Sequence, residues 1–166
     1  MANSFYLDAS ALAERYVPEP GSAQVNAILD TVPSNRLFVL NIGMGELVSI
    51  LVRKRNAGVI SQAYFVQALV NFDGEIVHAS NICKVSVTRR LVTTSFPLIV
   101  AHSINSTDAL TLKSALAIAR KLRAGGGDLV FVPSDQPLLR AAGAEGLNGF
   151  NPESQGHAAL TPLLGP

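Results

Sequence analysis

The stretch "SFYLDASALAERYV", residues 4–17, joins a short apolar segment to a predicted helix through one carboxylate. Phe5, Tyr6 and Leu7 are apolar or aromatic, Asp8 follows them directly, and Ser10 stands two residues later. This order predicts a buried strand that ends at Asp8. Because aspartate is a favoured N-cap, the pattern on its own is explained as well by a helix cap as by a functional acid.

A second stretch, "DLVFVPSD" at residues 128–135, repeats the arrangement, since a nearly continuous apolar run precedes Asp135 and a predicted helix. Shorter strands are predicted over residues 36–40, 84–87 and 147–150. Helices are predicted over residues 11–17, 22–32, 41–58, 61–72, 88–104, 106–127 and 136–146. Apolar strands separated by helices favour a parallel sheet that is covered on both faces. We therefore predict an α/β fold, a three-layer α/β/α sandwich with a mostly parallel central sheet.

The composition is that of one globular domain with a sizeable core. The chain has 166 residues, 48% of them hydrophobic and 15% charged, and its mean hydropathy is +0.31. These values exclude a disordered, highly charged chain. We predict one domain over residues 1–152 and a C-terminal tail over residues 153–166, which is either disordered or docks its leucines on a partner.

The sequence favours a cytoplasmic protein. No apolar run approaches the roughly 18 residues that cross a bilayer, and Asp8 interrupts the first apolar stretch. Cys83 is the single cysteine, so no internal disulfide can form, which fits a reducing compartment. The net charge of +1 does not indicate general affinity for nucleic acid, so any such binding needs a local patch.

Four of the twelve acidic residues occupy positions that structure alone does not readily explain. Asp8 and Asp135 follow apolar strands, and ligands of open α/β sheets bind at the carboxyl ends of strands. Glu46 lies four residues from both Ile42 and Ile50, so it is predicted to interrupt an inward-facing apolar stripe. The alternative for Glu46 is an edge position from which its carboxylate reaches water.

Asp108 is the fourth acid, in the first turn of the helix predicted over residues 106–127. Its face continues through Leu112, Ala115 and Ala119. The alternative role is stabilisation of the helix dipole. Four carboxylates around one cleft repel each other unless a cation is bound. Oxygen ligands of this kind suit Mg²⁺ or Mn²⁺, which can activate water for attack on a phosphate. The three histidines are far apart and show no zinc-ligand spacing.

The order of these motifs resembles the PIN-domain family, and especially the VapC-type ribonuclease toxins, over residues 4–152. "YLDASAL" resembles the family's first motif, with Asp8. "GELVSILVRKRNAG" resembles the helix with the second acid, Glu46, and "STDALTLKSALAIA" resembles the third motif, led by Asp108. "FVPSDQPLLRAAGAEGL" resembles the last motif, with Asp135, and "FNPE" resembles the family's usual close.

The resemblance implies a metal-dependent endoribonuclease that is the toxin of a type II toxin–antitoxin pair, with a small antitoxin partner and a homodimeric state. The four acids would hold Mg²⁺ or Mn²⁺, with Asp8 and Asp108 closest to it. Ser10 and Ser134 would either orient a carboxylate, a water or the phosphate, or cap helices. Thr111 stands where relatives often carry histidine, and Asn41 stands where they often carry Ser or Thr. Both departures concern substrate preference.

Contacts to RNA phosphates need cations near the acids. The candidates form three groups along the chain, and each is also explained as a solvated helical face: Arg53, Lys54 and Arg55; Arg89 and Arg90; Arg120, Lys121 and Arg123. With no tryptophan and 6% aromatic residues, base stacking is not indicated. The apolar segment over residues 88–100 and the high hydrophobic fraction suggest a buried interface and hence a dimer.

Three other functions remain open. A haloacid-dehalogenase-like phosphatase needs a second aspartate where this chain has Ser10. A nucleotide-binding loop at Gly125–Gly127 would have to follow a strand, whereas these glycines follow a predicted helix and are better interpreted as its end. A non-catalytic PIN-like binding or scaffold protein is the third, although the presence of all four acids disfavours it.

Overall fold

In the computed structural model, which describes residues 3–165, five strands form one parallel sheet in the order β3-β2-β1-β4-β5. The strands are β1 (Ser4–Leu7), β2 (Leu37–Leu40), β3 (Cys83–Val85), β4 (Leu129–Val132) and β5 (Asn148–Gly149). β1 is central and lies between β2 and β4. The predicted three-layer α/β fold is confirmed, and its sheet is entirely parallel in the described chain.

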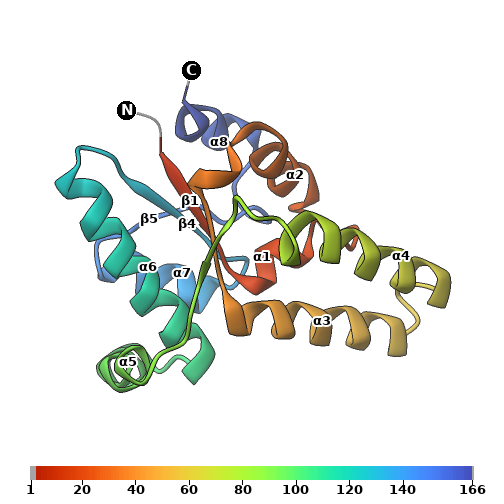
Figure 1. Cartoon of the computed structure of the whole chain (residues 1–166), viewed down its shortest axis with the longest axis horizontal. Coiled ribbons are helices and arrows are strands. Elements are labelled where there is room, and N and C mark those ends of the chain that lie inside the picture. Colours follow the sequence, from red (N-terminus) through yellow and green to blue (C-terminus); the bar gives the residue numbers. More distant parts are fainter. Residues whose placement is uncertain (1–2, 166) are drawn as a thin grey trace.

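Helices cover both faces of the sheet (Figure 1). They are α1 (Ala9–Ala13), α2 (Ser22–Thr31), α3 (Asn41–Asn56), α4 (Gln62–Phe72), α5 (Arg89–His102), α6 (Ser106–Ala124), α7 (Gln136–Ala144) and α8 (His157–Leu164). A 3₁₀ turn over Ser34–Arg36 precedes β2, and a π-helical turn over Asp73–Val77 follows α4. Helix α1 is shorter than predicted, and α5 is one continuous helix with Pro97 inside it.

The strands divide their side chains between two cores, as the two-residue period of a strand requires. Phe5 and Leu7 of β1 belong to the core under α1–α4 and α8, whereas Tyr6 belongs to the core under α5–α7. Strand β4 alternates in the same way. The Tyr6 hydroxyl and the Ser114 hydroxyl share a buried hydrogen bond of 2.6 Å, which fixes α6 against β1.

The prediction that the face of α3 with Ile42, Glu46 and Ile50 points into the core is wrong. The fully buried residues of α3 are Leu47 and Leu51, whereas Ile42 is 47% exposed and Ile50 is only partly buried. Successive helical residues are about 100° apart, so a core face centred on Leu47 leaves Glu46 at its margin. Glu46 is half-buried there, as its alternative edge position requires.

The predicted tail folds back on the domain. Its described part, to residue 165, includes α8, which packs against α2. Leu160 is fully buried in the core with Val25 and Ile28 of α2, and Asn3 donates a hydrogen bond to the Leu163 carbonyl oxygen. The leucines of this segment therefore complete the chain's own core. Among residues 3–165, no helix combines the length and the apolar character needed to cross a bilayer.

The orientation of α3 predicts that two substitutions on this helix differ in their effect on the free energy of unfolding. Leu47→Ala removes a fully buried side chain and should lower the free energy of unfolding by about 2–5 kcal/mol. Ile42→Ala changes a half-exposed side chain and should cost about 1 kcal/mol or less. Urea denaturation of both variants measures the difference, and equal losses would contradict the observed face.

Candidate functional site

The pairing of β1 with β4 determines where two of the predicted acids lie. Asp8 follows β1 and Asp135 follows β4, and these strands are parallel neighbours. The backbone N–H of Asp8 donates to the Val132 carbonyl oxygen at 3.0 Å, so the two strand ends are held together. Glu46 comes from the second turn of α3 and Asp108 from the first turn of α6, both of which begin beside this edge.

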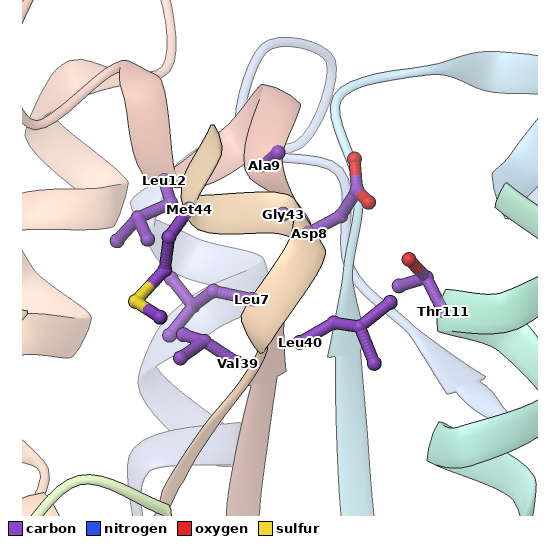
Figure 2. Close-up of a pocket in the computed structure, with 9 residues that line it drawn as sticks. All are labelled: Leu7, Asp8, Ala9, Leu12, Val39, Leu40, Gly43, Met44 and Thr111. Carbon is purple, nitrogen blue, oxygen red and sulfur yellow. The ribbon is translucent and has the colours of Figure 1, made fainter. Parts of the chain in front are cut away.

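Asp8 is the most deeply buried of the four acids, at 6% exposed. Its Oδ2 accepts hydrogen bonds from the Ser10 hydroxyl at 2.5 Å and the Ser10 backbone N–H at 3.1 Å, and so caps α1. Figure 2 shows Asp8 between the first turn of α3, which carries Gly43 and Met44, and Thr111 of α6. These residues line a shallow pocket at the carboxyl edge of the sheet.

The four acids interact electrostatically. Burial raises the pKa of Asp108 to about 7, helped by the negative charges of Asp8, Asp135 and Glu46 and opposed by the hydrogen bond from Asn105. Burial followed by the charge of Asp8 raises the pKa of Glu46. Burial also raises the pKa of Asp8, where the charge of Asp135 adds to the effect and the Ser10 hydrogen bonds oppose it. The fold therefore gathers all four acids at one edge.

Two of these acids are helix caps as well. Asp8 caps α1, and the Asp135 carboxylate accepts the Leu138 backbone N–H at 2.8 Å and caps α7. The cap interpretation and the functional interpretation therefore do not exclude each other. In the described chain, no three of the four acids bring ligand atoms within 4.8 Å of one another. Mg²⁺ tolerates such spacing, because it keeps several waters and uses one or two carboxylates directly.

The two predicted serines behave differently. Ser10 contacts Asp8, as described, and its hydroxyl oxygen also accepts the backbone N–H of Ser134 at 3.2 Å. The Ser134 hydroxyl turns away from the four acids and donates to Glu14. Ser134 therefore orients a carboxylate, but one outside the predicted set.

A second acidic group, which sequence reasoning did not single out, contains that carboxylate. Glu14, Glu19 and Glu153 place one ligand atom each within 4.8 Å of one another, close enough to hold a metal ion. Among residues 3–165 this is the one group of three or more Asp, Glu, His or Cys residues that does so. The sequence gives little signal for it, because Glu14 is followed directly by Arg15, as on a solvated helical face.

The predicted cation groups do not act as units. Arg53 is exposed and lies near enough to Glu46 to oppose the rise in that residue's pKa. Its neighbour Lys54 pairs with Glu19, and the Arg55 guanidinium stacks 4.6 Å from the centre of the Phe65 ring. The remaining candidates lie on exposed helix ends, with Arg123 paired to Asp128: Arg89, Arg90, Arg120, Lys121 and Arg123.

No protein-family model and no curated protein matches this sequence. Solved structures do match. PAE2754 from Pyrobaculum aerophilum superposes with a TM-score of 0.62 at 18% identity, over 98% of this chain and 96% of that one. FitAcB from Neisseria gonorrhoeae superposes with a TM-score of 0.56 at 18% identity, over 91% of this chain and 99% of that one. FitAB bound to the IR36 DNA fragment superposes with a TM-score of 0.60 at 14% identity, over 92% of this chain and 98% of that one.

The fold is PIN-like. At identities of 14–18% the likeness concerns the fold alone, although it extends over nearly the whole chain. The PIN-like topology agrees with the order of motifs in the sequence, and it places their four acids at the carboxyl edge of the sheet.

The raised pKa of Asp108 predicts a pH effect on the metal-free protein. In the unfolded chain this carboxyl titrates near 3.8, and in the folded chain near 7. Its contribution to stability is therefore complete below about pH 4 and is lost as the pH rises through about 7. With EDTA present, the Asp108→Asn variant should gain stability relative to the original chain between pH 5 and pH 8.

Urea denaturation at the two pH values measures this gain. Asp30→Asn is the matched control, because Asp30 is an exposed acid whose ion pair with Arg15 lies on the surface. An Asp108→Asn variant whose pH dependence equals that of the original chain would show that the acids are not coupled.

Proposed function

We propose that this protein is a Mg²⁺- or Mn²⁺-dependent endoribonuclease, the VapC-type toxin of a toxin–antitoxin pair in the cytoplasm. The observation that carries the proposal is the gathering of Asp8, Glu46, Asp108 and Asp135 at one edge of the sheet. These acids come from four separate segments, and after burial the negative charges of neighbouring acids in the group add to the raised pKa of Asp8, Glu46 and Asp108. A fold that gathers like charges in this way gains from a bound cation.

The donor set fits a hard divalent cation. All four side chains offer carboxylate oxygens, which Mg²⁺ and Mn²⁺ prefer. Asp8 and Asp108 are the proposed direct ligands, and Glu46 and Asp135 act directly or through water. When bound, such an ion supplies Lewis-acid polarisation of a phosphodiester and lowers the pKa of a coordinated water.

The chain's own residues supply orientation. Ser10 holds Asp8 through two hydrogen bonds, and the Asn105 side-chain amide holds Asp108 at 2.8 Å. Arg53 is the proposed first phosphate contact, because its positive charge acts on Glu46, one of the four acids. Arg89 and Arg90 lie in the first turn of α5 and are proposed to extend the contact along the RNA.

The proposed partners are a second copy of this chain and a small antitoxin. Exposed apolar side chains on α5 support an interface, since Phe96 is 52% and Val100 is 83% exposed. They are four residues apart and therefore share one helical face. The α4 helix exposes Tyr64, Val66 and Val70, which offer a separate apolar surface.

The rival functions fare differently. The phosphatase lacks its second aspartate, because that position holds Ser10, whose hydroxyl donates a hydrogen bond to Asp8. Gly126 has a positive φ of 81° where α6 ends before β4, so the glycines form a helix end, as predicted. A non-catalytic PIN-like binding protein is the alternative that the following experiment addresses.

Nuclease activity tests the proposal. The full chain should cleave members of a panel of transfer and ribosomal RNAs with Mn²⁺ and lose cleavage with EDTA. Asp8→Asn retains a capping side chain but removes the charge, so activity should fall at least a hundredfold while the fold persists. Asp30→Asn should keep full activity. Gel analysis of end-labelled RNA, with single-stranded DNA alongside, measures these outcomes.

A chain that binds Mn²⁺ and RNA without cleaving either nucleic acid would support the non-catalytic alternative. Cleavage that survives both EDTA and Asp8→Asn would contradict the proposed site.

The dimer is tested through α5. Phe96→Asp with Val100→Asp should convert a dimer to a monomer, because two charges would enter an apolar interface. The matched control, Val66→Asp with Val70→Asp on α4, should leave the dimer intact. Sedimentation equilibrium of the three proteins measures the mass, and a monomeric original chain would refute the interface.

A further inference from the structure

The group formed by Glu14, Glu19 and Glu153 lies outside the four acids of the proposed nuclease site. Glu14 ends α1, Glu19 lies in the loop before α2, and Glu153 lies between β5 and α8. Residues 14–19 and the distant residue 153 thus bring three carboxylates within 4.8 Å of one another. Such an arrangement needs a positive partner or a proton, because like charges at this separation repel strongly.

Glu14 provides an independent indication of a missing partner. The residue is 1% exposed. Its Oε1 accepts the Ser134 hydroxyl, whereas its Oε2 is buried and has no hydrogen-bond partner. A buried, unpaired carboxylate oxygen is costly, and in native proteins such atoms have a partner, an ion or a water.

The backbone around Glu14 is shaped to admit this carboxylate. A Cβ on Gly21 would collide with Glu14 Oε2 and lie 2.8 Å from the Pro152 carbonyl carbon and side chain. Glycine is therefore needed for the close approach of Glu14 and Pro152 to the Gly21 backbone, and not for its dihedral angles, since φ is −88°. Because Gly21 has no side chain, Glu14 Oε2 can occupy its position beside the other two carboxylates.

The resident cation does not balance the charge. Lys54 pairs with Glu19, and among residues 3–165 it is the one cation in a salt bridge with the group. One ammonium against three carboxylates leaves two negative charges if all three acids are ionised. Burial raises the pKa of Glu14 to about 7, the charges of Glu153 and Glu19 add to this rise, and the Ser134 hydrogen bond opposes it.

We propose that Glu14, Glu19 and Glu153 form a second binding site for a hard divalent cation, separate from the strand-end acids. The donor set is all carboxylate, which selects Mg²⁺, Mn²⁺ or Ca²⁺ and disfavours metals that prefer nitrogen or sulfur. The ion joins the end of α1 to the segment that leads into α8. This site does not depend on the nuclease activity proposed above.

Counting bound Mn²⁺ in the full chain tests the proposal. The variant with Asp8→Asn and Asp108→Asn lacks two of the proposed nuclease ligands and should still bind one equivalent of Mn²⁺. Adding Glu14→Gln and Glu153→Gln to it should abolish that equivalent. Adding Asp30→Asn instead should retain it. Electron paramagnetic resonance of free Mn²⁺ provides the count, and circular dichroism confirms that each variant is folded.

Thermal unfolding gives a second readout that is independent of nuclease activity. At a hundredfold excess over Kd, Mn²⁺ should raise the Tm of the Asp8→Asn, Asp108→Asn variant by roughly 5 °C or more. The shift should vanish in the variant that also lacks Glu14 and Glu153. If that variant does not fold, Glu19→Gln replaces it, and Kd should rise at least tenfold.

Two results would overturn the second site. One is that the Asp8→Asn, Asp108→Asn variant binds no Mn²⁺ and shows no shift in Tm. The other is that it binds Mn²⁺ equally well after the glutamates are replaced, which would place the ion elsewhere. If the original chain fails to cleave RNA, neither the number of bound Mn²⁺ ions nor the shift in Tm is affected. The two proposals can therefore fail independently of each other.

Discussion

Repulsion among carboxylates at the carboxyl edge of the sheet is the constraint on which the proposed site depends. Parallel pairing of β1 with β4 places Asp8 and Asp135 at adjacent strand ends, so their separation is set by the sheet itself. The Tyr6–Ser114 hydrogen bond and the fully buried Leu112 and Ala115 hold α6 against the sheet, which opposes movement of Asp108 away from the other acids. The unfavourable charge is therefore built into the fold, and an ion can relieve it where movement of the chain cannot.

Strand and helix patterns were sufficient to predict the layers and the positions of Asp8 and Asp135 after strands, because each depends on short-range order. An apolar run of four residues that ends in aspartate, followed by a capped helix, predicts both β1 and the position of Asp8. The face of α3 is harder to predict. Ile42, Glu46 and Ile50 share a stripe, but which stripe is buried depends on where α3 crosses α1, and that contact is set by the tertiary structure.

The Glu14 group could not be predicted for a related reason. Glu14 lies beside Arg15, which suggests a solvated helical face, and Glu153 is the first residue of the predicted C-terminal tail. Their proximity arises only when α8 returns to α2 and Pro152 packs on Gly21. The Ser134 hydroxyl contacts Glu14, and this partner is set by the same long-range packing. Local patterns identify acids, whereas packing decides which of them meet.

The two acidic groups are joined by hydrogen bonds through two serines. The Ser10 hydroxyl donates to Asp8 and accepts the Ser134 backbone N–H, and the Ser134 hydroxyl donates to Glu14. The residue after Ser134 is Asp135, so one short loop contacts both groups. A cation at the Glu14 group would hold Glu14 and, through it, the Ser134 hydroxyl. The loop that positions Asp135 would then be held from both ends, which limits the movement of one acid relative to Asp8.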